Sequence, residues 1–275
     1  MFISWFRRLF GGKNPAGGQR EEALSAPPEE QVEIVKRDVV QPFATNAVVK
    51  QTAPTQIASR RKMDMAAESE LAQFMDENLY ELLLAEGGFT DIHRVYDRET
   101  QLAGIDVVAK TEKSVAYIDE KAQLYYINKN LPTFAFELQS INRGIEREGW
   151  FLNDSLKTDF YLLIWPFADA DDVKTLQKKD ITHVDALLIS KKKLREKLAQ
   201  IGLDKNELQD KARELRVSKR YGKTRTEHAG VYYFFSAPTY YAETPINIVI
   251  KRSYLEKIAT VHYEVYPGGF RRLDQ

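Results

Sequence analysis

The sequence predicts an α/β domain with a mixed β-sheet, preceded by a disordered N-terminal tail. Three observations lead to this prediction: an apolar helical stripe opens the folded part, short strand-like runs follow it, and charged helical segments separate the later strands. The chain has 275 residues, of which 43% are hydrophobic, so it can build a substantial core in one large or two small domains.

Residues 1–62 are predicted to form the tail. Glycine, proline, alanine and charged residues dominate from residue 11 onward, and such a segment buries too little apolar surface to offset its ordering entropy. Residues 1–12, MFISWFRRLFGG, differ because aromatic and leucine side chains recur there at helical spacing around two arginines. They predict a short amphipathic segment that contacts a protein or a membrane surface, with a frayed terminus as the alternative.

The domain of residues 63–275 is expected to open with a helix from about residue 65. Its apolar stripe consists of Leu71, Phe74, Met75, Leu79, Leu82 and Leu83, and Gly87 and Gly88 provide a stop signal. Strands are expected at 89–97, 104–110, 114–126 and 133–141, because turn-type residues separate these β-rich runs.

The second half of the domain is expected to continue as α/β and to end in a β-rich extension. Residues 143–159 predict a loop or short helix, and 160–168 and 184–190 predict strands. Charged helices are expected at about 191–201 and 204–217, followed by strands at 230–237, 246–252 and 259–266.

The composition excludes several classes of site. Lysine plus arginine equals aspartate plus glutamate at 40 each, so a nucleic-acid partner requires a local basic patch. The absence of cysteine excludes disulfides, thiolate metal sites and cysteine nucleophiles, and it suits a reducing cytoplasm, where we expect the protein. The four histidines are scattered along the sequence and do not predict a zinc site. The sequence contains no run of about 18 apolar residues that would predict a membrane span, and no glycine-rich phosphate loop that would predict an organic cofactor.

One polar constellation stands out on two strand-like runs. Asp119 and Lys121 are two residues apart and therefore share one face of a strand, and Asp106 lies at one end of the preceding run, just after Gly104. Carboxylates are preferred ligands of Mg²⁺ or Mn²⁺, and a nearby lysine can orient or help deprotonate an attacking water. These three residues therefore predict metal-assisted hydrolysis of a phosphodiester.

The residues G-I-D at 104–106 and D-E-K at 119–121 resemble the signature of the PD-(D/E)XK nuclease superfamily. The predicted element order over about residues 65–190 is also similar to its restriction-endonuclease-like αβββαβ core. The chain departs from the name motif at Ile105, where that motif has proline. The resemblance implies that Asp106 and Asp119 are the acidic metal ligands, that Lys121 is the motif lysine, and that Glu120 faces the metal through its backbone carbonyl.

The resemblance also implies further site residues from neighbouring elements. Some members place an extra amide beside the site, which points to Gln139, because we expect the strands at 114–126 and 133–141 to be adjacent. Several members contribute a glutamate from the first helix, and among Glu70, Glu77 and Glu81 we expect Glu77 because of its distance from the glycine stop. Many members of the superfamily act as dimers, so the resemblance leaves a homodimer open, and the sequence itself does not report the oligomeric state.

A basic segment provides candidates for contacts with phosphate groups. Residues 216–225 carry Lys219, Arg220, Lys223 and Arg225 without an acid, and we expect them to bind nucleic acid, with DNA as the substrate. The aromatic run at 232–235 can stack on bases or pack in the core.

Alternative interpretations remain open from the sequence. The D-E-K stretch can be a solvated edge strand with a local ion pair. The helix glutamates and the basic segment can be ordinary solvated faces. The whole chain can also be a catalytically inactive nuclease-fold module that docks a partner through residues 1–12.

Overall fold

The computed structural model describes residues 55–142, 144–170, 172–237 and 244–273. The chain divides into two compact units, Met1–Ala58 and Ser59–Gln275, and the description that follows concerns the second. The predicted amphipathic segment and most of the predicted tail lie outside the described residues. Helix α2 (Thr55–Met75) begins within the range expected for the tail.

The first helix forms where the apolar stripe predicts it. Helix α2 continues through a π-helical turn (Asp76–Tyr80) into α3 (Glu81–Ala85), and Leu71, Phe74 and Leu79 are almost fully buried. Gly87 and Gly88 follow with φ of +80° and +101°, a conformation that glycine adopts readily and that ends the helix.

A seven-stranded mixed sheet confirms the predicted α/β class with a mixed sheet. Its strands are ordered β1 (Asp91–Arg94), β2 (Val107–Lys110), β3 (Val115–Ala122), β6 (Phe160–Ala168), β7 (Ile181–Ser190), β11 (Val261–Tyr266) and β12 (Gly269–Leu273). Strands β3 and β6 are parallel, whereas all other neighbours are antiparallel. A short helix, α4 (Arg98–Leu102), occupies the predicted turn after β1, and Asp97 caps it by accepting a hydrogen bond from the Thr100 amide.

The remaining strands form a separate antiparallel sheet, which the sequence did not indicate. Its order is β5 (Ile145–Glu148), β4 (Thr133–Asn142), β10 (Ile246–Lys251), β9 (Val231–Phe235) and β8 (Gly222–Arg225). The predicted adjacency of the strands at 114–126 and 133–141 is therefore wrong, because β3 lies between β2 and β6. The chain turns out of the first sheet through Asn128 and Asn130, whose φ angles are positive.

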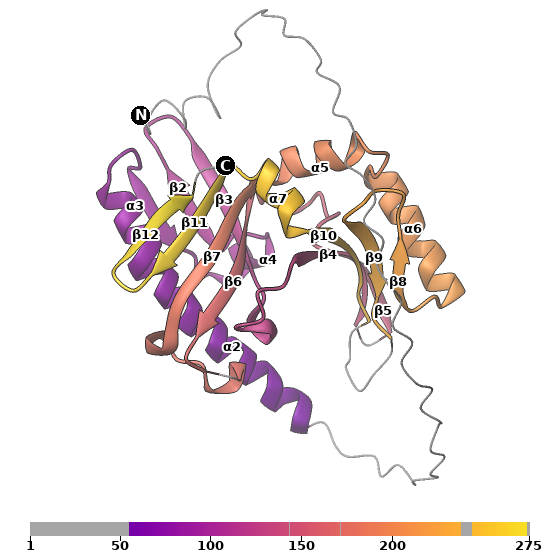
Figure 1. The fold of residues 1–275 in the computed structure, drawn as a ribbon, viewed down its shortest axis with the longest axis horizontal. Coiled ribbons are helices and arrows are strands. Elements are labelled where there is room, and N and C mark those ends of the chain that lie inside the picture. The colour runs from indigo at the N-terminus through magenta and orange to yellow at the C-terminus, as the bar shows by residue number, and fades with distance from the viewer. Residues whose placement is uncertain (1–54, 143, 171, 238–243, 274–275) are drawn as a thin grey trace, which may run out of the picture. The chain divides into compact units, whose positions relative to one another are not determined.

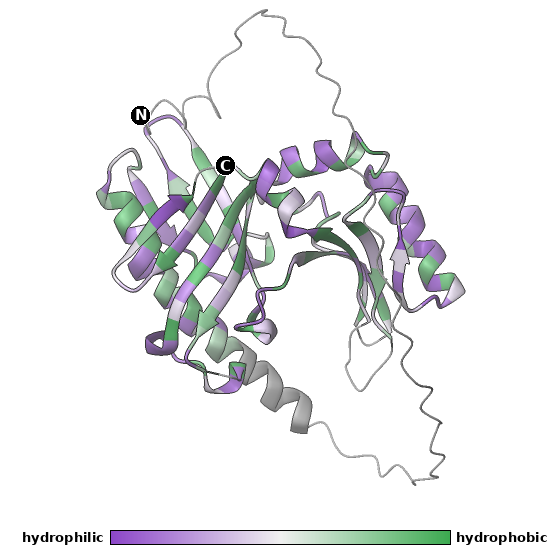
Figure 2. Cartoon of the chain, viewed as in Figure 1, coloured by the Kyte–Doolittle hydropathy of each residue, from purple (hydrophilic) through white to green (hydrophobic). Residues whose placement is uncertain are grey.

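Helices cover both sheets, as Figure 1 shows. Helices α5 (Lys191–Ala199), α6 (Lys205–Ser218) and α7 (Arg252–Ile258) lie near the second sheet, and α2 and α3 lie near the first. Helices α5 and α6 are largely purple in Figure 2, as expected from their charged outer faces. Among the described residues, none of the helices combines the length and apolar character needed to cross a membrane.

Two hydrophobic clusters occupy the two faces of the seven-stranded sheet. Even-numbered residues of β3 and β6, such as Ile118 and Leu162, pack with α2 and α3. Odd-numbered residues of β6, such as Tyr161 and Leu163, pack with the second sheet and with α5–α7. The face of each β3 side chain therefore decides which cluster it meets.

Candidate active site

Asp106 and Asp119 meet across strands β2 and β3. The register pairs Val107 with Ile118, so the preceding residue, Asp106, lies opposite Asp119. The Asp106 amide donates to the Ile118 carbonyl at 2.9 Å, and the Glu120 amide donates to Asp106 Oδ2 at 2.8 Å. Asp119 is only 3% exposed. The two acids that the sequence predicts for the site therefore lie next to each other, and Asp119 is shielded from solvent.

The proximity of the two acids changes the pKa of Asp106. Burial, the negative charge of Asp119 and a hydrogen bond that protonated Asp106 donates to that carboxylate raise the pKa of Asp106 from 3.8 to about 6. The Lys121 ammonium and the Glu120 amide act in the opposite direction without cancelling this effect. Two carboxyl groups held this close favour either a shared proton or a bound cation.

Lys121 completes the predicted group from the same face of β3. Its Nζ lies 2.5 Å from Asp119 Oδ1, so the ammonium is the direct counter-charge of the buried carboxylate. Nζ also lies 5.0 Å from the centre of the Trp150 ring, within the range of a cation–π interaction. Trp150 follows β5 and packs on Tyr161 and Phe136, so it shields the lysine from one side.

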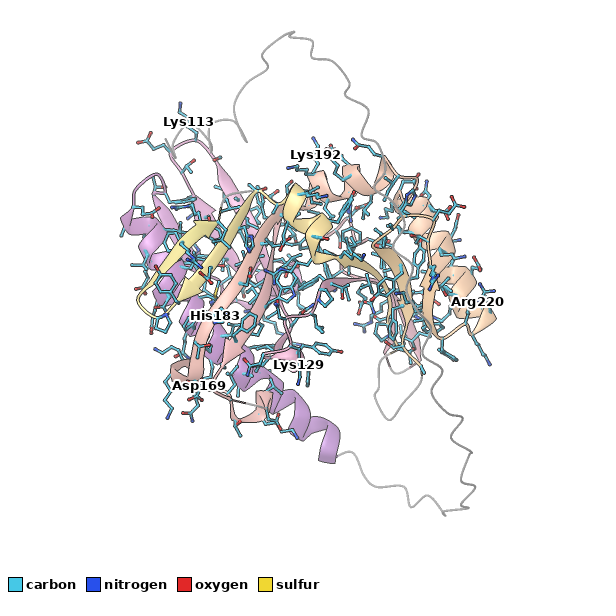
Figure 3. All side chains as sticks on the ribbon, viewed as in Figure 1. Lys113, Lys129, Asp169, His183, Lys192 and Arg220 are labelled. Atoms are coloured by element: carbon cyan, nitrogen blue, oxygen red, sulfur yellow. The ribbon has the colours of Figure 1, made fainter. Side chains whose placement is uncertain are left out.

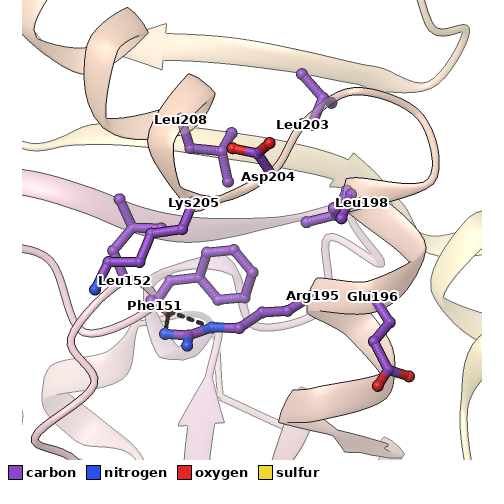
Figure 4. A pocket seen from close by; sticks show the side chains of 10 residues that line it. Phe151, Leu152, Arg195, Glu196, Leu198, Leu203, Asp204, Lys205 and Leu208 are labelled. Carbon is purple, nitrogen blue, oxygen red and sulfur yellow. Dashed lines mark hydrogen bonds between the residues drawn. The ribbon is translucent and has the colours of Figure 1, made fainter.

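The segment that carries Trp150 is linked to helix α5 by hydrogen bonds to the carbonyl of the next residue, Phe151. The Arg195 guanidinium of α5 donates to the Phe151 carbonyl from Nε at 3.2 Å and from NH2 at 2.5 Å (Figure 4). The apolar pocket beside this contact, between α5 and the start of α6, is lined by Leu198, Leu203 and other residues that include none of the candidate acids. The pocket is therefore separate from the candidate site.

Gly104 allows a connecting loop to approach the site closely. Its φ is +77°, and a Cβ built on it would lie 2.6 Å from Thr158 Oγ1. The Thr158 hydroxyl donates to the Gly104 carbonyl at 2.8 Å. Glycine is therefore required two residues before Asp106 both by conformation and by space.

Two residues near Asp119 were missed by sequence reasoning. Tyr161 lies opposite Asp119 on β6, and its buried hydroxyl has no hydrogen-bond partner within the described part of the chain. Burial and the Asp119 charge raise the pKa of Tyr161. The hydroxyl is thus a polar group that a bound ligand or water can satisfy.

The second missed residue is Lys191, which begins α5 and is only 8% exposed. Its Nζ donates to the carbonyls of Asn153 and Leu156 at 3.3 and 3.2 Å. Burial and Arg195 lower the pKa of Lys191, whereas Asp119 is among the acids that raise it. The next residue, Lys192, is exposed and points outward in Figure 3, so a run of lysines by itself did not identify the buried one.

The Glu120 side chain points to the opposite face of β3 and is not available to the predicted metal site. Tyr80 Oη donates to Glu120 Oε1 at 2.6 Å, and Arg94 NH1 donates to Oε2 at 2.5 Å. Arg94 also forms a bidentate pair with Asp76. Only the backbone of Glu120 faces the site. Alternate residues of β3 direct both their N–H and their C=O groups toward β2, and the Glu120 amide contacts Asp106 in this way.

The structure does not bring Glu77 to Asp119. Glu77 is exposed and pairs with Lys178 Nζ at 2.5 Å. The surrounding helix packs on the even-numbered face of β3, whereas Asp119 lies on the other face. A sheet therefore separates the helix acids from the candidate site.

Gln139 is also placed elsewhere, because β4 belongs to the second sheet. Its Nε2 donates to Glu146, and its Oε1 accepts from Arg216 Nε at 2.9 Å. The predicted role of Gln139 depended on adjacency of β3 and β4, which the structure contradicts.

The predicted phosphate-binding residues lie at one edge of the second sheet. Lys219 caps the C-terminal end of α6, Arg220 follows it and points outward in Figure 3, and Lys223 and Arg225 are on the edge strand β8. All four side chains are exposed. They remain candidates for contacts with phosphate groups.

No group of three or more histidine, cysteine, aspartate or glutamate side chains suited to a metal ion exists among the described residues. The candidate site offers two carboxylates instead. Comparisons with known protein families, with curated proteins and with solved structures found no match.

Proposed function

We propose that the protein is a metal-dependent nuclease that hydrolyses phosphodiester bonds of nucleic acid, with DNA as the expected substrate. The observation that carries this proposal is the convergence of Asp106, Asp119 and Lys121 on one face of a mixed sheet. The proposal includes a restriction-endonuclease-like core formed by α2, β1–β3 and β6. The β4–β5 hairpin then takes the place of the second core helix.

The donor groups suit a hard divalent cation such as Mg²⁺ or Mn²⁺. Asp106 and Asp119 would supply carboxylate oxygens, and the Glu120 carbonyl would supply a third oxygen from the same edge of β3. The raised pKa of Asp106 supports this fit, because a nearby cation relieves the repulsion between the two acids. The bound ion would stabilise charge on the phosphate and make water more acidic.

The protein groups have separate roles in this proposal. Lys121 Nζ donates a hydrogen bond that orients the attacking water and stabilises negative charge developing on the phosphate. Trp150 limits the access of solvent to that ammonium. The buried, unpaired Tyr161 hydroxyl would donate to a water bound beside Asp119.

The activity is tested by cleavage of plasmid DNA and of single-stranded oligonucleotides with Mg²⁺ or Mn²⁺. Asp119→Asn and Lys121→Met are each expected to lower the rate by at least about a hundredfold. Glu77→Gln is the matched control, because its exposed side chain lies on the helix across the sheet from the site, and it is expected to stay within a few-fold of wild type. Equal cleavage by wild type and Asp119→Asn would contradict the proposed site, and inactive wild type would contradict the activity.

A further inference from the structure

The second sheet has one face that the hydrophobic core does not cover. Val231, Tyr233 and Phe235 of β9 point into the core, so the alternate residues Tyr232 and Phe234 point to the other face. Strand β9 lies between β8 and β10 (Figure 1). The two outward aromatic side chains therefore stand inside the sheet and not at its margin.

Cationic side chains flank these aromatic residues on β8. The register pairs Lys223 with Phe234 and Arg225 with Tyr232, so all four belong to the same face. Phe234 is 40% exposed, and both cations are exposed. Lys223 Nζ lies 4.0 Å from the centre of the Tyr232 ring.

Lys223 and Arg225 lie directly beside the aromatic residues on this face. An acid, Glu137 of β4, lies on the same face, but β10 and β9 separate it from Lys223. Exposed aromatic surface flanked by cations is the combination that binds unpaired bases together with their phosphates. Paired bases of a duplex are already stacked, so they cannot use the faces of these rings.

We propose that this face, defined by Lys223, Arg225, Tyr232 and Phe234, binds single-stranded nucleic acid. The inference rests on the proposed nuclease function and names its substrate class. Phe234 offers its exposed ring to one base, and Tyr232, about 6.8 Å away on the same strand, holds Lys223 over its half-buried ring. Lys223 and Arg225 neutralise the adjoining phosphates.

Binding is tested by fluorescence anisotropy with a labelled oligothymidylate of roughly 16 nucleotides in EDTA, so that no cleavage is needed. Wild type is expected to bind the single strand more tightly than a duplex of the same length, and the affinity is expected to fall with added salt. Phe234→Ala is expected to weaken single-strand binding by about five- to a hundredfold. Phe234→Leu keeps the apolar contact without the flat ring and is expected to weaken it as well.

Tyr266→Ala is the matched control, because Tyr266 is 41% exposed on β11 of the other sheet, and it is expected to leave binding unchanged. Preference for the duplex, binding that neither Phe234 variant weakens, or no binding by folded wild type would overturn the inference. Single-strand binding without metal-dependent cleavage would instead overturn only the proposed nuclease function. Cleavage with unaltered binding by Phe234→Ala would overturn only the proposed binding face.

Discussion

Replacing Asp106 by asparagine tests the electrostatics of the candidate site without a substrate. The folded protein holds Asp106 at a pKa of about 6, whereas an ordinary aspartate has 3.8. A difference of about two pKa units corresponds to about 3 kcal/mol at 1.36 kcal/mol per unit. Above pH 6, ionised Asp106 therefore opposes folding by up to about this amount, and neutral asparagine removes the penalty while keeping an acceptor for the Glu120 amide.

The pH dependence fixes the sign of the effect. In wild type the folded state binds more protons than the unfolded state between pH 3.8 and 6, so stability falls as the pH rises through this window. Asp106→Asn is therefore expected to match wild type near pH 4 and to exceed it by up to about 3 kcal/mol at pH 8. For a domain of this size, this difference corresponds to a rise of roughly 6–12 °C in Tm.

The assay is thermal and denaturant unfolding in EDTA at pH 4, 6 and 8. Asp185→Asn provides a control of opposite sign: despite its burial, bonds to His262 and Arg252 lower the pKa of Asp185. That variant is expected to be less stable than wild type at pH 8. An Asp106→Asn protein that is no more stable than wild type at pH 8, or equally stabilised at pH 4, would refute the close pairing with Asp119.

Three further changes have expected outcomes. Gly104→Ala is expected to destabilise the fold by at least about 1 kcal/mol in denaturant unfolding, because its φ is positive and the added Cβ meets Thr158; unchanged stability would contradict this packing. Arg94→Met is expected to cost about 3–5 kcal/mol in the same assay, because it leaves Glu120 buried without its cation; a loss below about 1 kcal/mol would show the pair to be solvated. Below pH 6, Mn²⁺ affinity is expected to fall about tenfold per pH unit as Asp106 takes up a proton, and a flat profile in calorimetry would argue against this ligand.

The period-two pattern of strands accounts for what could be predicted of the site. Because side chains alternate along β3, the sequence places Asp119 and Lys121 on one face, and the structure joins them at 2.5 Å. The same rule places the Glu120 side chain on the other face, although the contacts to Tyr80 and Arg94 depend on elements far away in the chain.

The remaining errors came from information that local patterns do not contain. Alternation identifies the buried face of β4 but not its neighbouring strands, so Gln139 was assigned to the wrong sheet. An exposed glutamate on a helix does not reveal which sheet face the helix covers. For this reason the sequence favours Glu77 as a site residue, although the structure does not bring it to Asp119. Tyr161 and Lys191 reach Asp119 only through the parallel β3–β6 pairing and the start of α5.

Calorimetric titration with Mn²⁺ or Mg²⁺ is the most direct test of the central claim. Wild type is expected to bind one cation with release of protons near pH 6, because Asp106 must ionise to bind it. Asp106→Ala/Asp119→Ala is expected to lose this binding, whereas Glu77→Gln is expected to keep it. Absence of binding to folded wild type, or equal binding by the double variant, would contradict a metal site at the paired acids.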